Sequence, residues 1–217
     1  MSTYRLNLQA IESSLRDVQR EFPRINAILR SRRDAMSDEV VTNMMAGYTL
    51  VDKVLADDTD LLTAKHGAYL LELNHIVLCG LDPTVRQEYR RHLEVTTQRF
   101  YRQEGFNVDD LLRWHEEHQG ESPWKRAAGV YVRVLSQPQL YIEGNHRTGA
   151  LIMSYILIRA GKAPFVLTVK NAKAYFDPST LVKETKKTAV TLLVKLPRMK
   201  KRFANFLQGQ ANEKYLL

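Results

Sequence analysis

A short, almost wholly apolar segment sets the strongest limit on what this chain can fold into. Residues 150–158 (ALIMSYILI) follow the polar turn EGNHRTG and end at Arg159. The segment is much shorter than the about 20 residues that a membrane-spanning helix needs. A helix that is apolar on nearly every side must instead be covered by other elements. It is therefore predicted to be the central helix of a packed domain.

Most of the remaining chain shows apolar residues at steps of three and four, as on one face of a helix. Helices are predicted at 8–22, 37–55, 61–78, 84–103, 108–118 and 123–136. Ser37, Asn107 and Ser122 suit helix N-caps, and Pro23 is expected to break or bend the first helix. Only Pro164–Val169 resembles a strand. The fold class is predicted to be all-α, with at most a small β-hairpin.

The composition is that of an ordinary folded domain. The 217 residues contain no repeat and no low-complexity linker, so we expect one domain: an extension at 1–35, a core at 36–176 and basic helices at 177–217. A single cysteine, Cys79, excludes an internal disulfide. The charged start of the chain does not resemble a secretory leader, and a cytoplasmic location is expected.

The net charge is +8, and basic residues concentrate towards the end of the chain: Lys183, Lys186, Lys187, Lys195, Arg198, Lys200, Lys201 and Arg202. Such a balance indicates a polyanionic partner, nucleic acid included, or simply a solvated basic helix face. No zinc-finger spacing, RNP-like run or aromatic-interleaved groove is present to decide between them. The sequence indicates neither a partner by name nor an oligomeric state.

Two clusters resemble metal ligands but do not have the required spacing. His115-Glu116-Glu117-His118 lacks the i, i+4 histidine pair of zinc peptidases, and we expect a solvated helix end. Glu72-Leu73-Asn74-His75 matches the Glu-x-x-His of di-iron bundles, but no second copy exists in the chain. His75 is therefore expected to be a partly buried polar group with a local partner.

The turn ahead of the apolar segment has the residues of an anion site. The first N–H groups of a helix lack partners and carry a partial positive charge, which favours a bound anion. Arg147 adds a fork of donors for phosphate oxygens, and Glu143 is a candidate Mg²⁺ ligand. The candidate phosphate-binding residues are Gly144, Asn145, His146, Arg147, Thr148 and Gly149. The alternative is an ordinary Gly-Asn turn and a capped helix.

The segment LYIEGNHRTGALIMSYILIRAG resembles the signature of the Fic (Fido) family, His-x-Phe-x-Asp/Glu-Gly-Asn-Gly-Arg-x-x-Arg. SPWKRAAGVYVRVLSQPQLY resembles the family's preceding helix, and GKAPFVLTVKNAKAYF the segment that follows the motif. SDEVVTNMMAGYTL resembles its inhibitory-helix segment. The resemblance covers most of residues 37–176.

This resemblance implies a mostly helical fold, ATP and Mg²⁺ as cofactors, and an unidentified target protein. Most members of the family transfer AMP from ATP to a hydroxyl side chain of a target. The motif histidine accepts the proton, the acid binds Mg²⁺ and the turn holds the phosphates. The last arginine binds the γ-phosphate, and a glutamate of the inhibitory helix pairs with that arginine.

The chain departs from the family at positions that carry the chemistry. Gln139 stands at the catalytic histidine, Ala150 at the second arginine and His146 at the second glycine. Upstream, Val41 stands at the inhibitory glutamate, between Ser37 and Asn43 at matching places. A glutamine does not titrate, so Gln139 cannot act as a general base. The joint loss of the arginine and its glutamate avoids a buried unpaired charge. The target-binding flap is expected to be absent, because residues 84–103 keep a helical step.

Three hypotheses remain open at this stage. The first is a degenerate Fic-fold protein that binds a nucleotide or phosphorylated ligand and transfers AMP weakly or not at all. The second is an active Fic-type transferase with another base, for which His146 is the candidate. The third is a basic interaction module whose anion site has no ligand.

Overall fold

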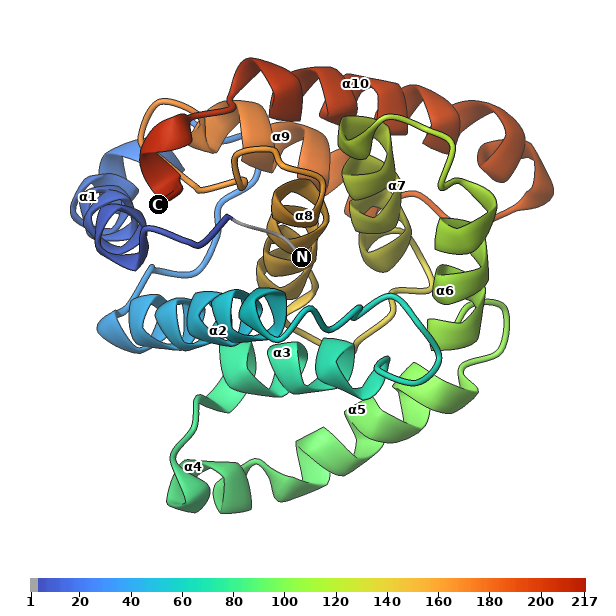
Figure 1. Cartoon of the computed structure of the whole chain (residues 1–217), viewed down its shortest axis with the longest axis horizontal. Coiled ribbons are helices and arrows are strands. Elements are labelled where there is room, and N and C mark those ends of the chain that lie inside the picture. Colours follow the sequence, from blue (N-terminus) through green and yellow to red (C-terminus); the bar gives the residue numbers. More distant parts are fainter. Residues whose placement is uncertain (1–3) are drawn as a thin grey trace.

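The computed structural model describes residues 4–217, which form ten α-helices and no sheet (Figure 1). The helices are α1 (Leu8–Ala27), α2 (Asp38–Ala56), α3 (Ala68–Cys79), α4 (Pro83–Glu88), α5 (Arg90–Arg102), α6 (Val108–Glu117), α7 (Pro123–Leu135), α8 (Asn145–Arg159), α9 (Ala172–Lys183) and α10 (Leu196–Gly209). A π-helical turn, η1 (Thr191–Lys195), precedes α10, and a short 3₁₀ turn, η2 (Glu213–Tyr215), follows it. The predicted all-α class is confirmed.

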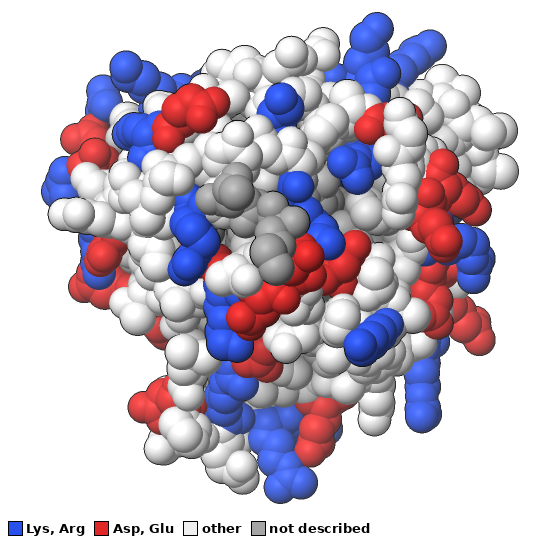
Figure 2. Space-filling model, in the orientation of Figure 1, with Lys and Arg blue, Asp and Glu red and all other residues white. Residues whose placement is uncertain are grey.

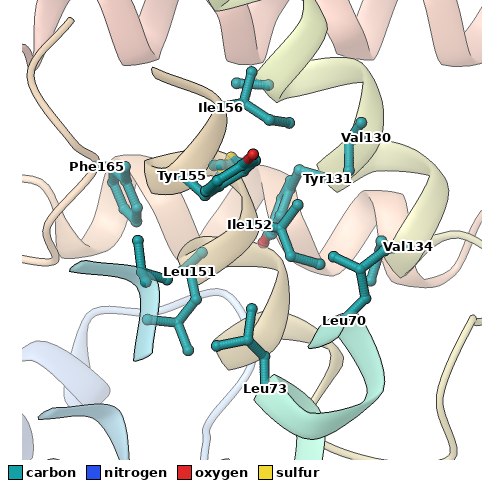
Figure 3. Packing of buried hydrophobic residues seen from close by; sticks show 14 of the residues in the cluster. Leu70, Leu73, Val130, Tyr131, Val134, Leu151, Ile152, Tyr155, Ile156 and Phe165 are labelled. Atoms are coloured by element: carbon teal, nitrogen blue, oxygen red, sulfur yellow. The ribbon is translucent and has the colours of Figure 1, made fainter. Parts of the chain in front are cut away.

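Helix α8 lies in the middle of the molecule, with α2, α3 and α7 packed around it (Figure 1). Every residue of α8 from Thr148 to Ile158 is buried. Leu151, Ile152, Tyr155 and Ile156 of α8 lie among side chains of α3 and α7 (Figure 3). The near-uniform apolar character of this segment thus corresponds to cover on every side, as predicted.

One hydrophobic core runs through the three parts that the sequence suggested. Its buried members include Ile11 of α1, Tyr48 of α2, Ile152 of α8 and Phe203 of α10. The predicted boundary at residue 176 falls inside α9, which is a single helix. Close to the two ends of the chain, the Asn7 N–H donates to the Tyr215 carbonyl at 2.9 Å.

The helix predicted at 61–78 begins only at Ala68. Residues 61–67 form turns and a bend, and side chains accept hydrogen bonds from the first backbone N–H groups of this segment. The Leu61 N–H donates to the hydroxyl of Tyr155 on α8 (3.1 Å), and the Leu62 N–H donates to the Asp60 carboxylate (3.1 Å). A tertiary contact from the central helix therefore overrides the local apolar periodicity.

Two other helices differ from expectation in their limits. The segment 84–103 is divided into α4 and α5 at Tyr89, and the part of the chain that the structure describes shows no hairpin there. The first helix continues through Pro23 to Ala27. Ser37, Asn107 and Ser122 cap their helices through side-chain hydrogen bonds, as predicted.

The strand predicted at 164–169 is not formed. Residues 164–168 have no regular secondary structure and Val169 lies in a turn, and carbonyls of the segment bond to side chains instead of a partner strand. The Phe165 carbonyl accepts from the Tyr48 hydroxyl (2.8 Å) and from Ser154 Oγ (2.7 Å), and the Val166 carbonyl accepts from Asn171 Nδ2 (3.0 Å). Across residues 4–217, no helix is both long enough and apolar enough to span a bilayer.

Candidate functional site

The polar turn of the motif forms the start of α8. Gly144 is the N-cap and has φ +73°, in the left-handed region that favours glycine. The first backbone bond of the helix joins the Thr148 N–H to the Gly144 carbonyl at 2.9 Å. The N–H groups of Asn145, His146 and Arg147 precede it and are the helix-end donors of this site. The Thr148 N–H, expected among them, is used inside the helix.

These residues lie on the wall of a cavity of about 790 Å³. Residues 143–147, Gln139 and Ala150 line it, together with side chains of α1, α2, α9 and the connection at 31–36. The volume is in the range of small-molecule sites. The cavity therefore brings together the motif turn and the two positions where the chain departs most from the Fic signature.

Asn145 holds the turn in shape with its side chain. Its Oδ1 accepts from the Tyr141 N–H (3.0 Å), its Nδ2 donates to the Tyr141 carbonyl (2.9 Å), and the residue is buried. Both groups of the amide are thereby used. Asn145 offers a ligand its backbone N–H, while its side chain fixes the loop that carries Gln139.

We expect Asn145→Ala to lower the free energy of unfolding by about 2–4 kcal/mol, because it leaves two buried backbone groups of Tyr141 without partners. Urea denaturation followed by circular dichroism measures the change. Asn205→Ala, at an exposed position of α10, is the matched control and should change stability by no more than about 0.5 kcal/mol. Equal effects of the two substitutions would contradict the role given to Asn145.

Arg147 lines the cavity and also reaches α3. Its Nη1 donates to the Val77 carbonyl near the end of α3. Burial lowers the pKa of Arg147, an effect that the carboxylates of Glu143 and Glu39 oppose. Among residues 4–217, no carboxylate lies within ion-pair distance of Arg147. The guanidinium is held in place by a neutral carbonyl, so its charge is not cancelled by a bonded acid.

His146 is fixed by a chain of hydrogen bonds. Ser179 Oγ donates to the Tyr175 carbonyl (2.6 Å), so the Tyr131 hydroxyl must donate to Ser179 (2.6 Å) and accept from Nδ1–H of His146 (3.1 Å). The other ring nitrogen, Nε2, then carries the lone pair. It is buried and has no partner among the described residues. Burial, then Arg33, Lys183 and Arg147, lower the pKa of His146 to about 3.

Gln139 lies at the edge of the cavity on a short loop after α7. Its side-chain Nε2 donates to the Leu135 carbonyl (3.1 Å), and the backbone carbonyl of Gln139 accepts from Arg99 Nε (3.0 Å). Lys187 Nζ fixes the same loop by donating to the Ser136 carbonyl at 2.6 Å, and also to Pro138. Gln139 is thus held by hydrogen bonds at the edge of the cavity, and its side-chain amide does not titrate.

The other motif residues have distinct roles. Glu143 is exposed at the cavity, and its carbonyl accepts from Asn74 Nδ2 at 2.9 Å. Asn74 Nδ2 also donates to the buried Thr148 Oγ1 (3.0 Å), so Thr148 is a structural residue. At Gly149 an added Cβ would lie 2.7 Å from Tyr131 Cδ2. Gly149 therefore permits the close approach of α7 and α8 and does not contribute to the anion site.

The predicted inhibitory-helix positions lie on α2 or at its start. Ser37 is the N-cap, accepting from the Val40 N–H at 3.3 Å. Val41 is fully buried in the same hydrophobic core as Ala150 of α8, and α2 packs against α8. Asn43 is also buried. The α2 residues that line the cavity are Val40, Met44 and Tyr48.

Three cations that line the cavity, Arg32, Arg33 and Lys183, were not assigned to the site from the sequence. Arg33 donates from Nη2 to Thr180 Oγ1 (3.1 Å) and lies over the Phe176 ring at 4.5 Å. Its buried Nε has no acceptor within residues 4–217. Lys183, the last residue of α9, lines the same wall. The run RSRRD before α2 was the available signal for Arg33, but only the fold brings it to the motif turn.

The two metal-like clusters are engaged in packing and ion-pair contacts. His115 is buried and not solvated as expected, and burial lowers its pKa to about 4. His118 stacks on Trp114. Glu72 pairs with Arg86 at 2.7 Å and lies 4.0 Å from His75, which agrees with a histidine that has a local partner. Among residues 4–217, no three His, Cys, Asp or Glu side chains are arranged to hold a metal ion.

Comparison with known proteins identifies no relative: the chain matches no protein-family model, no curated protein and no solved structure.

Proposed function

We propose that the cavity at the start of α8 binds a nucleotide through its phosphates, with Mg²⁺, and that the protein acts mainly by binding. One observation carries this proposal. The N–H groups at the start of α8, which have no partner within residues 4–217, and the cations Arg147, Arg33 and Lys183 all line one cavity. The resemblance to the Fic signature supplies the candidate ligand, ATP, and places its phosphates at this turn.

The charges of the cavity suit a polyphosphate. A helix N-terminus favours an anion by hydrogen bonds and by its field. Arg147 and Arg33 offer planar forks of donors, and Lys183 offers a compact charge. Arg33 comes from a segment outside the resemblance. We assign to it the part of the γ-phosphate clamp that Ala150 cannot supply, since both residues line the cavity.

The residues present also fit a magnesium ion carried by the nucleotide. Mg²⁺ is usually held by one or two carboxylates together with substrate phosphates. Glu143 is an exposed carboxylate on the cavity wall. When bound, the ion would neutralise phosphate charge. Glu143 would orient it, and Arg147 and Arg33 would hold the remaining phosphate oxygens.

Weak or absent AMP transfer follows from two residues. The amide of Gln139 accepts no proton at neutral pH, and a positioned general base is typically worth ~10²–10⁴ in rate. Ala150 offers no charge to the phosphates. Binding is less affected than transfer, because the helix end and Arg147 remain.

Isothermal titration with ATP and about 5 mM Mg²⁺ is expected to give a saturable 1:1 complex, and a labelled-ATP assay is expected to give little or no labelled protein. Adenosine is the control ligand, since it lacks the phosphates that the cavity cations would contact. A chain that binds adenosine as tightly as ATP, or binds neither, would sink the proposal.

A second candidate is a transferase in which His146 is the base. The hydrogen bonds through Tyr131 and Ser179 leave the lone pair on His146 Nε2, as a base requires. Its pKa of about 3 makes it a weak proton acceptor at neutral pH, which favours the binding function. Transfer by the unmodified protein that survives Gln139→Ala and is lost in His146→Gln would establish this alternative.

A further inference from the structure

The segment that joins α9 to α10 exposes apolar side chains in unusual density. Val190 is 72 % exposed, Leu192 39 %, Leu193 79 % and Val194 46 %. They belong to the helical stretch that starts at residue 189, passes through η1 and continues as α10. Four exposed apolar side chains within five residues are rarely left in water without a partner.

This apolar cluster, Val190 with Leu192–Val194, lies at a projecting corner of the molecule. In Figure 1 the chain between α9 and α10 reaches the right-hand edge before it turns back as α10. Buried Leu196 and Phe203 fix the following helix to the core. The corner is thus held on a packed helix, and its side chains project outward from it.

Basic residues surround the cluster. Residues 183–202 carry eight lysines and arginines and one acid, Glu184. This segment alone therefore accounts for most of the net charge of +8 of the whole chain. Lys187 and Lys200 are used inside the protein: Lys187 bonds the 136–138 loop and Lys200 pairs with Glu121 at 2.7 Å. Lys186, Lys195, Arg198, Lys201 and Arg202 are exposed and, within residues 4–217, form no ion pair.

Charged residues are distributed unevenly around the corner. Figure 2 shows a white surface at this edge, with Lys and Arg above it over α10 and, below it over α6, Asp and Glu with some Lys or Arg among them. An apolar corner with cations on the α10 side and most of the acids on the α6 side suits an approach in which α10 faces a negatively charged plane. The acids over α6 would then remain turned towards water.

We propose that the apolar cluster and its neighbouring cations dock on an anionic lipid bilayer, the apolar side chains entering the interface and the cations contacting headgroups. Insertion of apolar side chains and attraction of cations to anionic headgroups together give stable binding to a membrane surface, whereas either one alone gives only weak binding. Nucleic acid would use the cations but not the exposed leucines. A symmetric contact between two copies would bring two strongly basic segments together, which like-charge repulsion opposes.

Sedimentation of the full chain with vesicles tests the proposal. We expect binding to vesicles with about 30 % phosphatidylserine, little binding to pure phosphatidylcholine, and weaker binding as salt rises from about 0.1 M to about 0.5 M. Leu193→Ser should weaken binding about tenfold, and Lys195→Gln about fivefold. The matched controls are Leu81→Ser, which also removes an exposed leucine (63 %), and Lys162→Gln, and neither should matter.

A second experiment measures whether the apolar cluster enters the bilayer. Cys79 is buried, so a dye that senses polarity should label Leu193→Cys selectively. Its emission is expected to shift to the blue with anionic vesicles, whereas the dye on Leu81→Cys should not shift. Unchanged circular dichroism of each variant checks that the exposed substitutions leave the fold intact.

Three results would overturn the proposal. The first is an absence of binding to anionic vesicles. The second is binding that Leu193→Ser leaves unchanged and that duplex DNA competes away, which indicates nucleic acid. The third is a dimer that Leu193→Ser dissociates, with no dye shift on vesicles, which indicates a second copy of the chain. None of these outcomes depends on whether a nucleotide binds in the cavity.

Discussion

The double substitution Arg33→Gln with Arg147→Gln is expected to weaken ATP binding by about 10²-fold or more. A hydrogen bond to a charged group contributes ~1.5–3 kcal/mol, or about 10–150-fold in affinity for each arginine. Glutamine removes the charge but keeps an amide that can donate to Thr180 or Val77, where Arg33 and Arg147 donate now. The loss should therefore be in affinity and not in folding.

Isothermal titration of each single variant and of the pair measures this effect, with thermal unfolding without ligand as a check on the fold. Arg91→Gln is the control, since Arg91 is an exposed arginine of α5 that does not line the cavity. If the pair binds ATP as the unmodified protein does, the phosphates do not lie between these arginines.

The second large effect expected is a gain of AMP transfer. Gln139→His should raise transfer by up to ~10²–10⁴, the contribution of a positioned base. The imidazole can donate to the Leu135 carbonyl as Gln139 Nε2 does now, which leaves its other nitrogen as the proton acceptor. Adding Ala150→Arg should raise transfer further, because phosphate positioning and proton transfer act on the same transition state.

Labelled ATP with lysate proteins, followed by mass spectrometry of the modified side chains, measures the transfer. Gln139→Asn with Ala150→Arg is the control, since it restores the cation without a base. Ala150 is buried on α8, so thermal unfolding must show that the arginine variant folds. Equal transfer by the asparagine and histidine variants would contradict the assignment of position 139.

Local sequence signals predicted the helices and several of their ends. Ser37, Asn107 and Ser122 act through bonds to backbone groups two or three residues ahead, so the chain nearby contains the whole interaction. The limits that were wrong involve distant partners. Tyr155 of α8 takes the backbone groups at 59–61 and shortens α3, and Tyr48 with Ser154 occupies the carbonyl that a strand at 164–169 would have used.

In the candidate site too, the sequence predicted what depends on neighbouring residues and missed what depends on distant ones. The order Glu143-Gly144-Asn145 with Arg147 ahead of an apolar helix indicated the turn that starts α8 and that we propose as an anion site, because helix-end chemistry is local. The sequence did not show that the Asn145 side chain is occupied by Tyr141, or that Gly149 serves helix packing against Tyr131. Those roles depend on which residues the fold brings opposite each other.

What the sequence determined by itself is the helical class, the central place of residues 150–158 and the turn that begins that helix. Each of these rests on a periodicity or a cap, which acts over one or two helical turns. The tertiary structure decided the composition of the cavity. Arg33 lines the same cavity as the motif turn, more than 100 residues later in the chain, because α2 packs against α8 while α1 and α9 supply other walls of that cavity, and no local pattern encodes that approach. Side-chain contacts between distant segments arise only when the apolar faces of those helices close on one core.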